Sequence, residues 1–442
     1  MKHIFIFVAV FLMPLLCFAQ REDYVWVMGN NIIDFKTYPP TVIANDDFAY
    51  ATGLTSIADR YGNLKYWLSG KYLYNKNNEV IYEAEDYGVY EHMATLTIFP
   101  FPDDESKYIF LSLASGTIYF SIIDGSNDAL HPNVIKNFAT LPYGNSAPVI
   151  IQKTGSRNYW VIQEVNGYYC VYSLTKDGLS LKNSVEITND WHYGIGWSHV
   201  SRDQNKIMVY ETSWAEDFNY PVIDFDPANG VINHVTYHHA KGENYFGYCF
   251  TKNNKYMYFT MGNGAEGNFN ICRCPTDKIN EPDALKKYRS IVYTSTSNVD
   301  DMKLGPDGKI YFKTAMSSDY LGIICNSEDD NPVAELDGLK MALPMYTWSA
   351  FPRTYCYPFE MTCYVDCNSV RFLIPDTDFK TVEWVWEDGS VETNNVRARV
   401  RKYDHSGKYL VMARVDYDDG TVREYFADFE IKFPKTPNII CE

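Results

Sequence analysis

Pro306-Asp307-Gly308-Lys309-Ile310-Tyr311-Phe312 is the clearest copy of a pattern that recurs along this chain. In each copy a polar turn with Asp, Asn or Gly leads into a short alternating stretch rich in tyrosine, which is typical of a strand that turns back on its neighbour. Other copies are residues 59–67, 203–210 and 253–259, and less regular ones are residues 106–110 and 157–161. Neighbouring copies are roughly 40 to 55 residues apart, the spacing of four-stranded propeller blades.

The strand pattern divides most of the chain into similar units. From about residue 24 to residue 352 short strands are bounded by Gly, Asn, Asp or Pro, and only residues 281–288 resemble a helical turn. Complete four-stranded units are predicted to begin near Thr55, Ala94, Pro148, Trp197, Phe246 and Asp301. The leftover strands at residues 24–27, 32–36 and 345–348 are predicted to share one blade, because strands from both chain ends then close the ring. The prediction is an all-β fold with a seven-bladed β-propeller, and six or eight blades are the alternatives.

A second domain is predicted at the C-terminal end. Its expected strands are residues 369–373, 381–386, 396–401, 409–417 and 421–433. Short strands separated by turns over about 75 residues favour an immunoglobulin-like β-sandwich. Trp384 and Trp386 alternate on one strand, so both should face the sandwich core.

The first residues resemble a secretory signal. Met1-Lys2-His3 is followed by an apolar run to Phe18 and by Ala19, which predicts cleavage after Ala19. A lipoprotein signal at Cys17 is disfavoured by the bulky Leu16 before it. The predicted domains are therefore a signal peptide at 1–19, a β-propeller at 20–355 and a sandwich at 356–442. No later stretch has the roughly 20 apolar residues of a membrane helix, so no transmembrane segment is expected in the mature chain.

Ten cysteines are present, and Cys17 lies in the predicted leader, which leaves nine. Export permits disulfides among them. Cys272 and Cys274 lie two apart on an expected strand, so they share a face and are poorly placed to bridge each other. The group Cys356, Cys363 and Cys367 is a better candidate for a local disulfide. A zinc site at Cys272 and Cys274 would need a second ligand pair, and the sequence has none at a suitable spacing.

Composition limits the partners. The formal net charge of -17 argues against nucleic acid, which is bound through basic surfaces. Aromatic residues make up 16% of the chain, with 37 tyrosines. They could form a sugar-binding surface, but tyrosine is also a favoured strand residue, and the second explanation is the simpler one.

No motif assigns a reaction. The chain has no Gly-x-Ser-x-Gly elbow, and the turn Ser201-Arg202-Asp203-Gln204 lacks the glycine and tryptophan of a sialidase Asp box. A pair of carboxylates for glycoside hydrolysis stays open among 56 acidic residues. The prediction therefore names no catalytic, cofactor-binding or metal-binding residue and no cofactor.

Two polar groups are candidate metal sites that the sequence disfavours. His234, His238 and His239 fall in a strand pattern that separates positions 234 and 238 by about 13 Å, so surface histidines are predicted instead. The acidic turns at residues 328–330 and 416–419 lack the full ligand pattern of a calcium loop and are expected to be solvated.

Several stretches resemble a known family. They are Trp26-Val27-Met28-Gly29 with Asp34-Phe35, Ser56-Ile57-Ala58-Asp59 with Gly62-Asn63-Leu64, Tyr72-Leu73-Tyr74-Asn75, residues 223–230, 304–311 and 320–324, Leu343-Pro344, and in the last domain Trp384-Val385-Trp386-Glu387-Asp388-Gly389 with Tyr403 and Gly407-Lys408-Tyr409. The chain resembles secreted Bacteroidota proteins that join a propeller to a polycystic-kidney-disease-type (PKD) sandwich, a group associated with gliding motility and type IX secretion. It ends at Glu442 without the C-terminal sorting domain of many members, so type IX export is not expected.

The function expected from these features is non-catalytic binding or a scaffold role. The protein is predicted to be exported to the periplasm, the cell surface or the medium, where a propeller face binds a protein or a polysaccharide. The polar loops at residues 124–132, 212–219 and 262–267 are the candidate contact regions. A propeller-based glycan hydrolase is the first alternative, and a subunit of an envelope assembly is the second.

Overall fold

The structure is a computed structural model of the 442-residue chain. It describes residues 15–16, 23–37, 39–45, 55–59, 62–83, 95–102, 104–114, 116–142, 148–153, 158–187, 195–211, 217–241, 244–263, 268–314, 318–345, 351, 362–366, 369–374, 379–416 and 422–431. The chain forms two compact units, Arg21–Pro358 and Phe359–Glu442 with Met1–Gln20. The predicted division between residues 355 and 356 lies outside the described residues.

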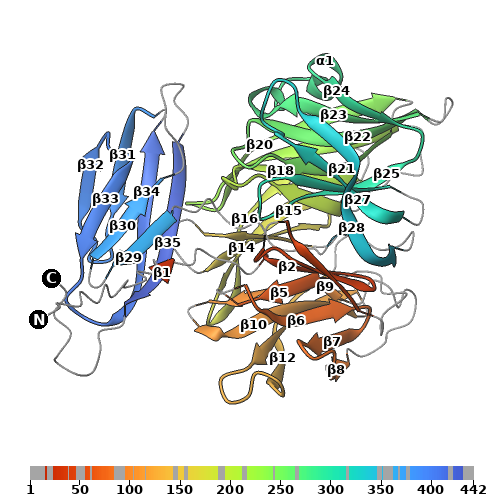
Figure 1. Ribbon diagram of the computed structural model, residues 1–442. Coiled ribbons are helices and arrows are strands. Elements are labelled where there is room, and N and C mark those ends of the chain that lie inside the picture. Colours follow the sequence, from red (N-terminus) through yellow and green to blue (C-terminus); the bar gives the residue numbers. More distant parts are fainter. Residues whose placement is uncertain are drawn as a thin grey trace, which may run out of the picture. The chain divides into compact units, whose positions relative to one another are not determined.

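The unit Arg21–Pro358 contains seven antiparallel sheets, numbered here in chain order (Figure 1). Sheet 1 has β2 (Val25–Met28), β3 (Asn31–Asp34) and β4 (Thr41–Ala44); sheet 2 has β5 (Thr55–Ala58), β6 (Leu64–Ser69), β7 (Tyr72–Asn75) and β8 (Val80–Glu83); sheet 3 has β9 (Thr95–Phe101), β10 (Asp104–Ala114), β11 (Thr117–Asp124) and β12 (Asn133–Pro142); sheet 4 has β13 (Val149–Gln152), β14 (Tyr159–Val165), β15 (Tyr168–Thr175) and β16 (Gly178–Glu186). Sheet 5 has β17 (Ile195–Val200), β18 (Lys206–Glu211), β19 (Asp217–Asp226) and β20 (Val231–Lys241); sheet 6 has β21 (Asn244–Phe250), β22 (Tyr256–Asn263), β23 (Asn268–Pro275) and β24 (Ser290–Ser295); sheet 7 has β25 (Val299–Leu304), β26 (Ile310–Thr314), β27 (Ser318–Cys325) and β28 (Val333–Met345).

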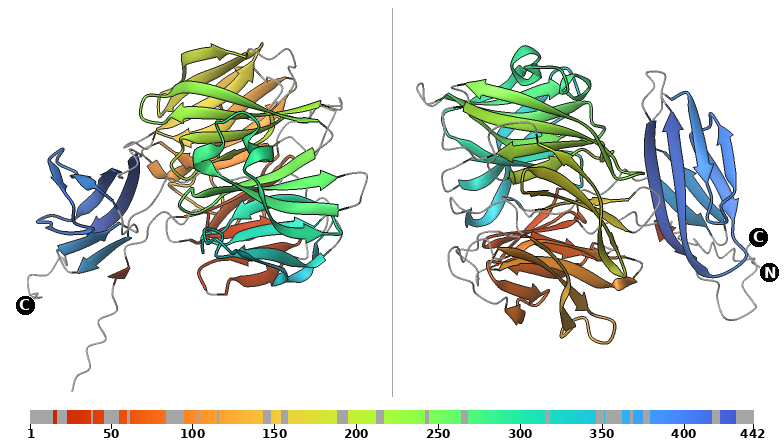
Figure 2. Two further views of the ribbon diagram at one scale, coloured as in Figure 1. Left: turned by 90° about the horizontal axis from the view of Figure 1, so that it is seen from above. Right: turned by 180° about the vertical axis from the view of Figure 1, so that it is seen from behind.

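The all-β prediction is confirmed, and six sheets begin within two residues of the predicted unit starts, from β5 at Thr55 to β25 at Val299. The prediction missed β4. Met345, expected in a closing strand, is the last residue of β28 in sheet 7, and residues 346–350 lie outside the described part. The expected helical turn is α1 (Ala284–Lys287), which follows the 3-10 helix η2 (Thr276–Lys278) and forms the coiled ribbon in Figures 1 and 2. No helix in the described part of the chain is long and apolar enough to cross a membrane.

The recurring sequence pattern is a tight turn that joins the first strand of a sheet to the second. The fourth residue of each turn, whose N–H donates to the carbonyl of the first, has a positive φ: 79° at Gly62, 61° at Gln204, 58° at Asn254 and 81° at Gly308. In sheet 7 the backbone N–H of Gly308 donates to Gly305 O, and Gly305 N–H donates to Lys309 O. Gly and Asn tolerate this left-handed conformation best, which explains why the turns carry them.

The hydrophobic core of this unit is divided among the gaps between sheets. Seven buried clusters each contain side chains from two consecutive sheets, and one of them joins sheet 7 to sheet 1. In that cluster Trp26 is fully buried and meets Phe35, Tyr311 and Phe351 edge to face, with ring centroids 4.6 to 5.5 Å apart. The Asn31 amide side chain donates to Leu343 O and accepts from Leu343 N, both at 3.0 Å. The sheets therefore form a closed circle of shared cores.

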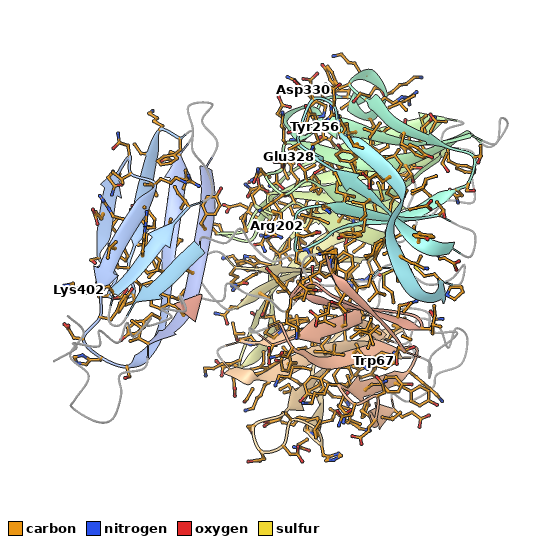
Figure 3. The ribbon with its side chains drawn as sticks, in the orientation of Figure 1. Trp67, Arg202, Tyr256, Glu328, Asp330 and Lys402 are labelled. Atoms are coloured by element: carbon orange, nitrogen blue, oxygen red, sulfur yellow. The ribbon has the colours of Figure 1, made fainter. Side chains whose placement is uncertain are left out.

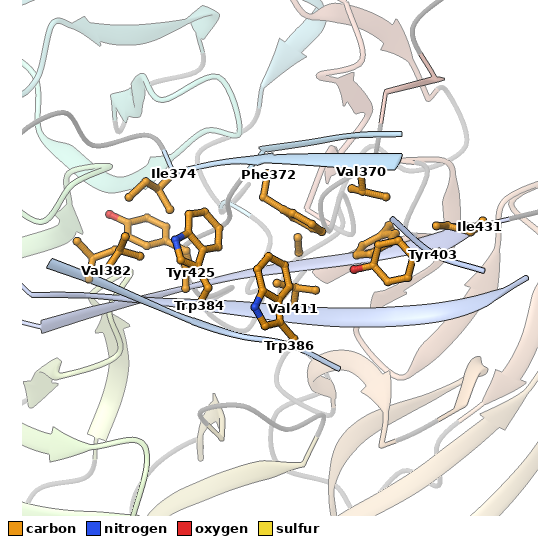
Figure 4. Close-up of a cluster of buried hydrophobic side chains, with 14 residues drawn as sticks. Val370, Phe372, Ile374, Val382, Trp384, Trp386, Tyr403, Val411, Tyr425 and Ile431 are labelled. Carbon is orange, nitrogen blue, oxygen red and sulfur yellow. The ribbon is translucent and has the colours of Figure 1, made fainter. Parts of the chain in front are cut away.

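The second unit contains two four-stranded sheets. One has β1 (Leu15–Leu16), β29 (Thr362–Asp366), β30 (Ser369–Leu373) and β33 (Ala398–Lys402); the other has β32 (Val391–Asn394), β31 (Thr381–Val385), β34 (Gly407–Asp416) and β35 (Val422–Ile431). Leu15 and Leu16 belong to the predicted leader. Trp384 and Trp386 lie in the shared core with ring centroids 6.0 Å apart, as expected from their alternation (Figure 4). The prediction from the sequence did not include strands β29 and β32.

Asp388 in the turn between β31 and β32 is expected to titrate near pH 2. The hydroxyl and the backbone N–H of Ser390 donate to its carboxylate and, with Arg401, lower its pKa to about 2. Because this pKa lies below the unfolded value of about 3.9, the stabilisation is present above that value and is lost as the pH falls through about 2. Carboxyl NMR titration measures it directly. A midpoint near 4 in the folded protein would contradict this assignment, and Ser390→Ala should raise the midpoint.

Candidate functional site

Each of the four-stranded sheets 2 to 7 has a polar end, called here the turn end, at which its first strand connects to its second and its third to its fourth. Antiparallel order places these two connections together and puts the connection between second and third strands at the other end. The three predicted contact loops are therefore separated. Residues 124–132 lie at the turn end of sheet 3, whereas residues 212–219 and 262–267 connect second to third strands at the opposite end. Of these two, residues 212–216 and 264–267 lie outside the described part of the chain.

Lysines alternate with carboxylates around the turn end. Their pairs are Lys65–Asp59 at 3.6 Å, Lys107–Asp104 at 3.1 Å, Lys107–Asp124 at 3.5 Å, Lys176–Asp177 at 3.0 Å, Lys206–Asp224, and Lys255–Asp330 at 3.9 Å. In sheet 1, Lys36 pairs with Asp34 at 3.2 Å and also donates to Asn63 Oδ1 in the turn of sheet 2. Four of these lysines stand where the second strand of a sheet begins, directly after the recurring turn. Partly exposed pairs of this kind add little stability. Their effect is to neutralise the local charge of an acidic protein.

The carboxylates at the turn end of sheet 3 are held in the ionised form. Partial burial opposes ionisation of Asp104, but hydrogen bonds from Ser106 and Lys107 lower its pKa overall. The Ser126 hydroxyl lowers the pKa of Asp124, and the backbone N–H groups of Leu130 and His131 lower that of Asp128. The pKa shifts resolved for Asp104, Asp124, Asp128, Glu281 and Asp388 are all downward. A general acid needs the opposite shift.

Loops at the turn ends of sheets 3, 5 and 7 fasten each of these sheets to the preceding one. The Tyr66 hydroxyl donates to Ala129 O at 3.1 Å, from sheet 2 to the loop of sheet 3. The Trp160 indole N–H donates to Pro227 O at 2.8 Å, and the Tyr258 hydroxyl donates to Ser327 O at 2.7 Å. In all three cases an aromatic residue on a second strand uses its polar tip to bind a loop between third and fourth strands. The aromatic ring itself stays in the shared core.

The junction of sheets 6 and 7 corrects the expectation that residues 328–330 form a solvated acidic loop. The Glu328 carboxylate accepts the backbone N–H and the side-chain amide of Asn253, both at 2.5 Å. Arg273, only 7% exposed, donates to the carbonyl oxygens of Asp329 and Asp330 and lies 4.1 Å from the Tyr256 ring centroid. Figure 3 labels Tyr256, Glu328 and Asp330 of this junction. The loop is a structural clamp, which its acidic composition alone did not indicate.

The histidine group also differs from the prediction of surface side chains. His234 is exposed, but His238 is only 1% exposed, and its Nε2 lies 2.7 Å from Ile279 O. The segment between β23 and β24, which contains Ile279, covers His238. All three histidines lie on strand β20 as expected. Among the residues that the structure describes, no group of three His, Cys, Asp or Glu side chains could hold a metal ion.

Four thiols of the first unit are buried. None of Cys170, Cys249, Cys272 and Cys274 forms a disulfide, and Cys272 and Cys274 share one cluster, in line with the prediction that they face the same side. Cys356 and Cys367 lie outside the described residues, as does the side chain of Cys363, so the predicted local disulfide stays a prediction.

We expect these four thiols to resist alkylation in the folded protein. Burial raises the pKa of Cys274 to about 12 and raises that of Cys170, so neither forms the reactive thiolate near neutral pH. Iodoacetamide labelling at pH 8 followed by peptide mass spectrometry should find the four sites unmodified natively and modified in 6 M guanidinium. Native labelling of Cys272 or Cys274 would contradict the buried placement.

Exposed apolar side chains are spread around the first unit. Except for Tyr168, the large ones described there lie on the last strand of a sheet: Ile43, Val80, Ile135, Leu181, Val231, Ile291, Val333 and Leu336. Single exposed apolar residues of this kind are ordinary on soluble proteins.

The opposite end of the sheets contains buried charged residues that the sequence analysis missed. Asp301 on β25 and Lys313 on β26 face each other in register, and each is buried. Glu164 on β14 is buried as well. The sequence around Asp301, Lys313 and Glu164 reads like that of the other strands, so composition gave no signal that these charged side chains are buried.

Comparison with known proteins gives fold likenesses only. No protein-family model matches the chain, and no curated protein matches it. Among solved structures, the chain is similar to the extracellular domain of a protein described as a one-component system from B. thetaiotaomicron, at 11% identity and a TM-score of 0.39, covering 95% of this chain and 57% of that one. It is also similar to Hsv2 from Kluyveromyces lactis, at 10% identity and a TM-score of 0.41, covering 75% and 99%. A third similar structure is a protein described as a 6-phosphogluconolactonase from Bacteroides fragilis, at 13% identity and a TM-score of 0.38, covering 79% and 97%.

Proposed function

We propose that this protein is an exported, non-catalytic binding protein: a seven-bladed propeller followed by a PKD-type sandwich, acting at the cell envelope or outside the cell. The circle of sheets with shared cores supports the propeller assignment. The leader at residues 1–19 and the resemblance to secreted Bacteroidota proteins support export. The sandwich is most simply a spacer or a second interaction module.

One observation carries the binding function. The turn-end carboxylates of sheet 3, Asp104, Asp124 and Asp128, are kept ionised by serine hydroxyls, backbone N–H groups and a lysine. A charged and prearranged surface of this type suits recognition of a polar ligand by hydrogen bonds and ion pairs.

The test is a screen of the mature chain, residues 20–442, against a glycan array and fractionated cell-envelope extracts, with both retention and released product measured. Retention of a defined polysaccharide or protein without turnover is the expected result. Released sugar would overturn the non-catalytic assignment in favour of a propeller hydrolase. Retention only within a multiprotein envelope complex would instead favour the subunit alternative.

A further inference from the structure

Two lysines of sheet 4 are exceptions to the pairing of lysines with carboxylates at the turn end, where Lys176 of the same sheet pairs with Asp177 at 3.0 Å. Lys153, just after β13, donates to the Ser173 hydroxyl at 2.6 Å, and its ammonium lies 3.9 Å from the ring centroid of Trp160. Lys182, on β16, is exposed. Among the described residues neither lysine forms an ion pair with a carboxylate. This is an unneutralised basic site in a chain of net charge -17.

The strand register explains why these side chains gather. Trp160 on β14 pairs directly with Ser173 on β15, and Ile151, two residues before Lys153, pairs with Trp160. Lys182 is the extra residue of a bulge between β15 and β16, where Val171 pairs with Asn183 and Tyr172 pairs with Leu181. A bulge re-aims a side chain relative to a regular strand. Lys153, Ser173 and Lys182 therefore come from three strands of one sheet.

The Trp160 ring, over which the Lys153 ammonium lies, forms the floor of the site and is held in place. The indole N–H of Trp160 is held by Pro227 O, and the backbone of Gly230 packs so closely that an added Cβ would lie 2.6 Å from the ring. The Asn183 amide donates to Gly230 O at 2.7 Å, which ties β16 to the same loop. A fixed aromatic floor restricts where the Lys153 ammonium can lie, so little conformational entropy is lost when a ligand binds.

The electrostatics point in the same direction. Burial lowers the pKa of Lys153, and the nearby charge of Lys182 lowers it further, without a compensating carboxylate. An anion would relieve the repulsion between the two ammonium groups. Since the Ser173 oxygen accepts from Lys153, its own proton is available to donate to an acceptor.

We propose that Lys153, Ser173 and Lys182 form a binding site for an oxyanion, namely the sulfate or carboxylate group of an acidic polysaccharide. The site rests on the proposed binding function and specifies the chemical class of its ligand. The two ammonium groups and the hydroxyl supply charge-assisted donors for one oxyanion. The adjacent tryptophan is held in the core and acts as a support for Lys153 rather than as a stacking platform.

The site itself is tested with inorganic sulfate and, separately, phosphate, titrated at constant ionic strength and followed by the NMR signals of the lysine ε-CH₂ groups. We expect the Lys153 signal to shift with saturation and the pKa of Lys153 to rise.

Lys182→Gln, an exposed change that should leave the fold intact, is expected to weaken binding of the ion roughly tenfold, since one charge-assisted contact is lost. Lys153→Met should abolish binding, and Lys153→Arg should retain it. The matched control is Lys176→Gln, which removes an exposed lysine of the same sheet that already pairs with Asp177.

The source of the oxyanion is tested with immobilised dextran sulfate, polygalacturonate and neutral dextran. Retention on an acidic polymer, lost in Lys182→Gln and kept in Lys176→Gln, supports the proposal. Binding of inorganic ions without retention on either polymer overturns the polysaccharide assignment. If neither ion perturbs Lys153, and Lys182→Gln behaves like the wild type on all polymers, the site does not exist. Retention of a neutral glycan in the screen would then leave the proposed binding function standing.

Discussion

Trp26→Ala is expected to lower the free energy of unfolding of the first unit by about 3–5 kcal/mol, the usual cost of truncating a buried tryptophan. Trp26 is fully buried where sheet 7 meets sheet 1, and it contacts Phe35, Tyr311 and Phe351. The lost contacts therefore come from both ends of the first unit, Phe35 near its start and Tyr311 and Phe351 near its end. Urea unfolding of residues 20–442, followed by near-UV circular dichroism, measures the change.

The matched control for this variant is Ile43→Ala, which truncates a side chain of the same sheet that is 51% exposed. It should change stability by less than about 0.5 kcal/mol. Because the two units can unfold separately, the transition of the sandwich serves as an internal reference. If Trp26→Ala costs no more than the control, the closing cluster does not stabilise the ring.

Arg273→Ala is expected to cost about 3–5 kcal/mol, because a buried charged donor is removed from two loop carbonyls and from the face of Tyr256. Arg273→Lys should recover only part of this loss, since an ammonium group cannot span both carbonyl oxygens as the planar guanidinium does. Thermal unfolding and hydrogen exchange of residues 326–332 should both report the change.

Asp330→Asn is the matched control at this junction. Its side chain is 89% exposed and pairs with Lys255 at 3.9 Å, so its loss should cost less than about 0.5 kcal/mol. Faster exchange confined to residues 326–332 in Arg273→Ala would show that the loop is fastened through the guanidinium. Unchanged exchange and stability would refute the clamp.

Much of the fold could be predicted because it depends on local chemistry. The turns at Gly62, Asn254 and Gly308 need a left-handed residue, and the tyrosine-rich strands after them follow the period of two. These signals placed six sheet starts within two residues. Strand β4 was missed because its sequence Thr41-Val42-Ile43-Ala44 is short and follows two prolines without a strong alternation.

The site was less predictable because it depends on contacts between distant segments. Glu328 contacts Asn253, and His238 contacts Ile279, across 75 and 41 residues. Composition predicted a solvated loop in the first case and a surface histidine in the second, and only the packing of neighbouring sheets reverses both. Lys153 and Lys182 are separated by two strands and a bulge, so neither spacing nor charge along the chain brings them together.

The fastening of sheets 3, 5 and 7 to the sheets before them gives the ring a direction that matters while the chain is being synthesised. The side chains of Tyr66, Trp160 and Tyr258 each donate a hydrogen bond to a loop that lies later in the sequence. As the chain emerges with its N-terminus first, sheets 3, 5 and 7, once completed, each supply the loop that binds to the sheet already folded before it. Assembly can thus proceed stepwise through contacts of short sequence separation, which form fastest. The contact between Trp26 and Tyr311 joins segments far apart in the sequence, so it forms last and slowly. Until it forms, the ring is open and the partly folded chain is exposed to aggregation.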